Sequence, residues 1–158
     1  EISCSLVGSE MCIRDSSRDG ERMAYANSVW VLMDTKKGIP VRVTKEISDA
    51  YGLDPQLPMQ CSERKIMLPE KYEEKDSLVV PSYFIDTNHH MNNTRYVQVA
   101  MEYVPKEFRT MEVRVEYKKA AMCRDVIVPH VTIEDPRVTV ALCAPDGQPY
   151  AVVVFLKA

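Results

Sequence analysis

One stretch in the second half of the chain has apolar residues at intervals of three and four. It runs from Asn93 to Val104 and predicts an amphipathic helix with a broad apolar stripe. Asn92 or Asn93 can cap its start, because asparagine side chains accept hydrogen bonds from the first free backbone N–H groups. Pro105 ends the helix, because the residue before a proline avoids the helical region.

Strands are predicted on both sides of this helix. Residues 111–118 alternate between apolar and charged positions, which is typical of an antiparallel strand with one buried face. Pro129, inside the next run, marks an edge or a bulge, and Pro145-Asp146-Gly147 predicts the turn of a hairpin. The strands are expected at residues 77–85, 111–118, 126–134, 138–143 and 150–157.

The first half of the chain has a weaker pattern. Residues 1–20 show no clear period and predict no element. Residues 29–43, VWVLMDTKKGIPVRV, predict a strand, a Lys-Lys-Gly turn and a second strand. This stretch aligns without a gap on residues 138–152, and Gly38-x-Pro40 falls on Gly147-x-Pro149. The ungapped match favours an internal duplication.

The duplication predicts how the chain divides. We expect residues 77–158 to form a complete domain and residues 1–48 the back part of a preceding copy. Residues 49–76, which include three prolines and the charged tract EKYEEKD, are expected to be a linker. The helix and first strand of the preceding copy would fall before residue 1, so we expect the chain to be part of a longer protein.

The order of elements, a strand, a helix and four further strands, indicates the fold class. An antiparallel sheet wrapped around a long buried helix is the hotdog architecture, an α+β fold. We therefore predict one complete hotdog preceded by the back part of another. An incomplete copy would leave apolar strand edges open, so we expect the chain to self-associate through them as a homo-oligomer.

Composition and charge exclude several classes of function. A net charge of −3 without a basic run argues against nucleic acid as a partner. Five scattered cysteines without CxxC spacing are typical of reduced thiols in a cytoplasmic protein. The longest apolar run, Tyr150–Leu156, is too short to cross a bilayer, and no signal peptide is visible. We expect a cytoplasmic protein with no membrane attachment.

Residues 86–93, DTNHHMNN, bring polar groups to the connection between a strand and the helix. Asp86 offers a carboxylate, Asn88 can donate and accept hydrogen bonds, and His90 can move a proton near neutral pH. The free N–H groups at the helix start favour negative charge. Hydrolysis of a thioester needs such groups to activate water and stabilise an oxyanion. The same residue types also cap helices and form turns, so a purely structural interpretation stays open.

The stretch DTNHHMNNTRYVQVAMEYVP resembles the motif of the acyl-ACP thioesterases of bacteria and plants. In that family Asp-x-Asn-x-His, followed by Asn-Asn-x-x-Tyr, opens the helix of the second of two tandem hotdog domains. VWVLMDTKKGIPVRV is similar to the end of the first domain, and VEYKKAA to a later strand of the second. The resemblance implies hydrolysis of fatty acyl-ACP, with Asp86, Asn88 and His90 as the catalytic residues. It implies acyl carrier protein and its phosphopantetheine arm as the partner, with no diffusible cofactor.

The sequence departs from the family at Ala120-Ala121, where plant members carry Glu-Cys. The carboxylate thought to act as a base there is absent, so Asp86 or another residue would take that role. A non-catalytic acyl-binding or assembly module is therefore an alternative. A hotdog dehydratase, which also uses a histidine and a carboxylate, is a third, although the Asn-rich motif and the repeat count against it.

Other polar residues give weaker evidence of a function. His89, His90 and His130 are not expected to bind a metal, because adjacent histidines rarely converge on one ion and no further ligand has suitable spacing. An acidic carrier would prefer basic residues, for which Lys118, Lys119 and Arg124 are candidates. The polar face of a strand explains these three equally well.

Overall fold

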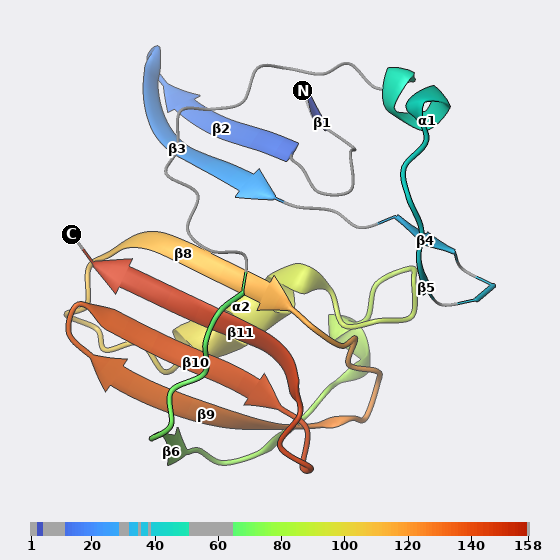
Figure 1. Cartoon of the computed structure of the whole chain (residues 1–158). Helices are drawn as coiled ribbons and strands as arrows, with labels where there is room; N and C mark the ends of the chain where they lie inside the picture. The colour runs from blue at the N-terminus through green and yellow to red at the C-terminus, as the bar shows by residue number, and fades with distance from the viewer. Residues whose placement is uncertain are drawn as a thin grey trace. The chain divides into compact units, whose positions relative to one another are not determined.

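The computed structural model of the protein describes residues 3–4, 12–28, 32–34, 36–37, 39–50 and 65–157 (Figure 1). The chain divides into two compact units, Glu1–Cys61 and Ser62–Ala158. The second unit contains the predicted helix and the DTNHHMNN segment.

The first unit contains a three-stranded antiparallel sheet, in the order β1-β2-β3, and a two-stranded one, β4-β5. Strand β2 lies where the sequence predicted no element. It forms a hairpin with β3 through Asp19-Gly20, both of which have positive φ, 53° and 81°. Asp-Gly suits such a two-residue turn, a signal that the hydrophobic pattern alone did not reveal. The elements are β1 Ser3–Cys4, β2 Cys12–Arg18, β3 Glu21–Ser28, β4 Met33–Asp34, β5 Ile39–Pro40 and α1 Lys45–Asp49.

The second unit is a six-stranded antiparallel sheet with one main helix across one face (Figure 1). The strand order is β6-β9-β10-β11-β8, and β7 also pairs with β9. This arrangement is the predicted α+β hotdog. Its elements are β6 Glu73–Glu74, β7 Leu78–Val79, η1 Ser82–Phe84, α2 Asn93–Met101, β8 Thr110–Tyr117, β9 Val126–Glu134, β10 Arg137–Cys143 and β11 Pro149–Lys157.

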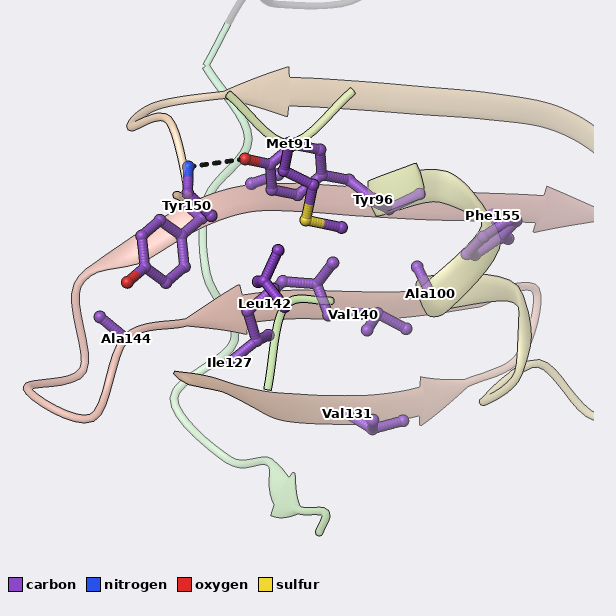
Figure 2. Packing of buried hydrophobic residues seen from close by; sticks show 14 of the residues in the cluster. Met91, Tyr96, Ala100, Ile127, Val131, Val140, Leu142, Ala144, Tyr150 and Phe155 are labelled. Carbon is purple, nitrogen blue, oxygen red and sulfur yellow. Dashed lines mark hydrogen bonds between the residues drawn. The ribbon is translucent and has the colours of Figure 1, made fainter. Parts of the chain in front are cut away.

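The core lies on both faces of the sheet, because β10 and β11 are buried on both sides. Alternate residues of these strands, such as Val140 and Val153, pack with Tyr96 and Ala100 of α2 (Figure 2). The residues between them form a second cluster on the opposite face, which Ile66 covers. Strands buried on two faces read as continuous apolar runs, and VVVFL in β11 is such a run.

The end of the predicted linker is part of this second unit. Ile66 is only 4% exposed, and its N–H donates to Glu116 Oε2 at 2.8 Å. Glu73 and Glu74 form β6 and pair with β9. Ile66, Glu73 and Glu74 of the predicted linker therefore contact the sheet.

The predicted strand at residues 77–85 is wrong beyond Val79. After β7 the chain forms a 3₁₀ turn, in which the N–H of Phe84 donates to Pro81 O at 3.0 Å. Pro81 has no N–H to donate to a sheet ladder, so it ends the strand that the apolar run predicted. The correction matters because this turn leads directly into Asp86.

The helix and the later strands agree with the sequence predictions. Helix α2 begins at Asn93, and its last predicted turn, up to Val104, continues with i→i+3 hydrogen bonds. Pro129 lies within β9 without a register shift, so it does not form a bulge. The Pro129 carbonyl accepts a hydrogen bond from the Lys75 N–H. In β9, Pro129 lies between the residues that pair with β6 and the residues that pair with β7. Proline has no backbone N–H. Pro129 thus lies at the gap between the β6 and β7 pairings of β9, where that N–H is not needed for strand pairing.

The Glu116 carboxylate should stabilise the second unit in a pH-dependent way. Burial alone would raise the pKa of Glu116, but hydrogen bonds from Lys118 and the Ile66 N–H, with the nearby positive charges, lower it below 4.5. A folded-state pKa below the unfolded value gives stability that is present above pH 4.5 and lost as the pH falls through the folded value.

Glu116→Gln should therefore lower the free energy of unfolding near neutral pH by about 1 kcal/mol. The loss should shrink as the pH falls below about 4.5. Urea denaturation across this range measures it, with Glu112→Gln, on the same strand but exposed, as the control. An equal effect of the two substitutions at every pH would contradict the prediction.

Candidate functional site

The polar segment forms a tight turn between η1 and α2, defined here as the site turn, residues 86–90. Ile85 and Met91 pair as an antiparallel bridge, so the next residues inward, Asp86 and His90, lie opposite each other. The Asp86 N–H donates to His90 O at 2.9 Å, and the His89 N–H donates to Asp86 O at 3.0 Å. His89 closes the turn with φ of 63°, a left-handed conformation.

This register explains the spacing of the three predicted site residues. Side chains directly opposite on an antiparallel pair share a face, with Cβ atoms about 5 Å apart. Asp86 and His90 therefore lie opposite each other across the turn, and Asn88 lies between them in the chain. Asp86 is half-buried, whereas Asn88 and His90 are exposed. The structure thus brings the three residues together on one turn.

The Asp86 carboxylate also shapes the turn. Its Oδ1 accepts the Asn88 N–H at 2.8 Å, which leaves Oδ2 for another partner. No hydrogen bond joins the side chains of Asp86, Asn88 and His90 to one another in the described part of the chain. Catalytic contacts often form only when substrate is bound, so this geometry is compatible with a hydrolytic site.

Asn92 caps the helix, as predicted. Its Oδ1 accepts the Thr94 N–H at 2.9 Å, and its carbonyl accepts the Arg95 N–H at 2.9 Å. The helix start therefore offers fewer free donors than the sequence suggested. Among the described residues, the Asn93 N–H has no acceptor and stays available to an incoming oxygen.

A second segment, the loop of residues 118–125, borders the site turn. The Met91 N–H donates to Ala121 O at 2.8 Å. The Ala121 N–H donates to the Tyr96 hydroxyl at 2.8 Å, and the dashed line that ends at the Tyr96 oxygen in Figure 2 marks this bond. Farther along, Val80 N–H donates to Asp125 O and Arg124 N–H donates to Val80 O, both at 2.9 Å. The Ala120-Ala121 pair, where the sequence departs from the plant members of the resembled family, therefore lies beside the site turn.

Three tyrosines support these two segments. Tyr117 donates its hydroxyl to Asn93 O at 3.0 Å, and its ring meets the Tyr96 ring edge to face, with centroids 5.7 Å apart. Tyr150 donates to Asp125 Oδ2 at 3.3 Å. Burial raises the pKa of Tyr96, the Ala121 N–H opposes this, and the charges of Asp125 and Asp86 add to the rise. Tyr96 is thus a neutral hydroxyl at physiological pH.

Sequence reasoning did not identify the supporting role of these tyrosines. Tyr96 lies in the helix that the sequence predicted, and its side chain is 2% exposed. The Asn-Asn-x-x-Tyr spacing was the one signal that linked Tyr96 to the site. Nothing in the sequence linked Tyr150 to Asp125.

Basic side chains line the 118–125 loop. Lys118 Nζ lies 2.7 Å from Glu116 Oε1, so its charge is partly neutralised. Lys119 Nζ lies 5.6 Å from the centroid of the Tyr150 ring, a cation–π contact. Arg124 is exposed and has φ of 71°. Within residues 65–157, neither Lys119 nor Arg124 forms an ion pair.

The third histidine has other contacts. His130, on β9, stacks on Tyr72 with centroids 4.0 Å apart, and its Nε2 lies 3.7 Å from Glu74 Oε2. In the described ranges, no three His, Cys, Asp or Glu side chains are placed to hold a metal ion. Within those ranges no helix is long and apolar enough to cross a membrane.

Comparison with known proteins supports the fold and the motif. Residues 68–140 match the family model of the acyl-ACP thioesterase C-terminal domain, which confirms the resemblance that the motif predicted. No curated protein sequence gives a significant match.

Two solved structures share the fold. An acyl-ACP thioesterase from Bacteroides thetaiotaomicron superposes with a TM-score of 0.80 at 17% identity, over 98% of this chain and 66% of its own. A proposed oleoyl thioesterase from Lactobacillus plantarum gives 0.71 at 22% identity, over 98% of this chain and 64% of its own. The chain thus spans just under two thirds of each of these proteins.

Proposed function

We propose that the site turn hydrolyses the thioester between a fatty acyl chain and acyl carrier protein, and so releases a free fatty acid that ends fatty acid synthesis. The observation that carries this proposal is the placement of Asp86 opposite His90, with Asn88 between them. These residues lie within the segment that matches the acyl-ACP thioesterase C-terminal domain.

The chemistry follows from the groups on the turn. Asp86 accepts a proton from water through its free Oδ2, and the water oxygen bonds to the acyl carbon. The Asn88 amide and the Asn93 N–H donate to the oxyanion of the tetrahedral intermediate. The intermediate then loses its carbon–sulfur bond. The departing thiolate receives a proton through His90, so the products are a fatty acid and the carrier thiol.

The partner follows from the charge of the neighbouring loop. A phosphopantetheine arm carries a phosphate, and Lys119 and Arg124 offer two positive charges in the loop beside the site turn. Neither charge forms an ion pair within residues 65–157. We assign these two residues to the carrier, as the contacts that orient it.

The missing carboxylate favours a second candidate function, a non-catalytic acyl-binding module. Ala120 is exposed and offers no base. Binding of acyl-ACP without turnover would support this alternative, whereas reversible hydration of an enoyl thioester would support the dehydratase.

Removing either Asp86 or His90 should lower turnover strongly. Asp86→Ala and His90→Ala should each lower the release of carrier thiol from acyl-ACP by about 10²-fold or more, because each removes a proton-transfer group. A thiol-reactive dye measures the release. His89→Asn, which keeps a residue that tolerates the left-handed conformation, serves as the control and should retain activity. Equal losses in all three proteins would count against the assignment.

Restoring a carboxylate beside the turn should increase activity. Ala120→Glu introduces an acidic group at the residue before Ala121, whose carbonyl accepts the Met91 N–H. Residue 120 is exposed, so it can accept the larger side chain. We expect kcat to rise about tenfold or more, because a positioned general base contributes at least that much. Ala120→Gln has the same shape without the charge and should not increase kcat. If the two variants are equally active, a carboxylate at residue 120 has no catalytic role.

Neutralising the loop should weaken carrier binding. Lys119→Gln with Arg124→Gln should raise KM for acyl-ACP severalfold at low salt and leave kcat unchanged, because surface charges steer association. The difference should shrink at high ionic strength. Lys71→Gln with Lys106→Gln gives the same change in charge elsewhere and is the control. An equal rise in KM for an acyl thioester of N-acetylcysteamine, which lacks the carrier, would refute this contact.

A further inference from the structure

We propose that Tyr96 is a positioning residue, whose buried hydroxyl fixes the 118–125 loop against the site turn. The proposal rests on the proposed hydrolytic function for its effect on turnover. The hydrogen bond itself does not depend on that function.

The backbone of Ala121 has a partner on each side. Its N–H donates to the Tyr96 hydroxyl at 2.8 Å, and its carbonyl accepts the Met91 N–H at 2.8 Å. Ala121 is fully buried, and Met91 and Tyr96 are each 2% exposed. Water cannot readily replace either bond, so a buried donor without its acceptor would be costly. Of the two bonds of the Ala121 backbone, one joins the loop to Met91, directly after the site turn, and Tyr96 provides the other, which joins the loop to helix α2.

The Tyr96 hydroxyl has little freedom to move. Its ring packs with Met91 and other core residues (Figure 2) and meets the edge of the Tyr117 ring. Tyr117 in turn donates its hydroxyl to Asn93 O, at the first residue of the helix. The acceptor for Ala121 is therefore fixed relative to the helix start and to the turn before it.

This placement affects the site because residue 120 directly precedes Ala121 in the chain. Any group at residue 120 is positioned by the bonds that Ala121 makes. A displacement of about 1 Å in an active site can lower a rate by about 10²-fold. Loss of the Tyr96 hydroxyl should therefore reduce turnover without removing a group that contacts substrate.

Another tyrosine of the same segment provides a matched control. Tyr103 follows α2, is half-buried and packs against the same core. In the described part of the chain its hydroxyl makes no hydrogen bond. Tyr103→Phe removes the same atom from the same cluster but leaves the loop untouched.

The test compares Tyr96→Phe with Tyr103→Phe, each in the parent chain and in Ala120→Glu. We expect Tyr96→Phe to lower kcat for acyl-ACP about tenfold with KM within about twofold. We also expect it to remove most of the gain in kcat from Ala120→Glu. Amide hydrogen exchange, followed by NMR, should become faster at Ala121 and Met91. Tyr103→Phe should cause none of these changes.

The outcomes separate the two proposals. The role of Tyr96 would be overturned if Tyr96→Phe left amide exchange at Ala121 unchanged. It would also be overturned if, in an active protein, Ala120→Glu raised kcat as much with Tyr96→Phe as without it. If no variant releases thiol but Tyr96→Phe alone speeds exchange at Ala121, the hydrolytic function fails and the positioning role stands. Should Tyr96→Phe not fold, the parent chain still decides, because rapid exchange of its Ala121 amide would contradict the proposal.

Discussion

The two hydrogen bonds of the Ala121 backbone are the constraint on which the rest of the site depends. One joins the 118–125 loop to Met91, and the other joins it to the buried hydroxyl of Tyr96. Both lie where water does not reach, so they hold the loop against the residue that follows the site turn and against helix α2. Without them, the loop would depend on its more distant hydrogen bonds, such as those of Val80 with Arg124 and Asp125.

The hotdog fold makes this constraint possible. Strands β10 and β11 are buried on both faces, which gives α2 a rigid surface to pack against. The helix then places Tyr96 in the core and its first residue at the surface. The site turn lies immediately before that residue, and the antiparallel register through Ile85 and Met91 sets Asp86 opposite His90. The candidate site residues thus lie near the surface, on a turn that packs against the core through Met91.

Much of this could be predicted from the sequence, because local patterns encode it. Helical periodicity, the Asn92 cap and strand alternation predicted α2 and the strands after it. At Pro81 the prediction failed because one proline ended a strand that the apolar run predicted. At Asp19-Gly20 it failed because the turn signal had no hydrophobic periodicity around it, so the β2–β3 hairpin was missed. The candidate site residues could be proposed because they are close together in the sequence. The contact between Tyr96 and Ala121 could not, because it joins segments that only the folded sheet brings together.

The central claim is that an acyl thioester binds at the site turn, beside the 118–125 loop. The most direct measurement is the change in amide chemical shifts when the protein binds carrier protein that carries a non-hydrolysable acyl thioether. This account predicts the largest changes at residues 86–93 and 118–125, with smaller ones elsewhere in the second unit. Changes centred on β6 and His130, or no changes at saturating ligand, would contradict it.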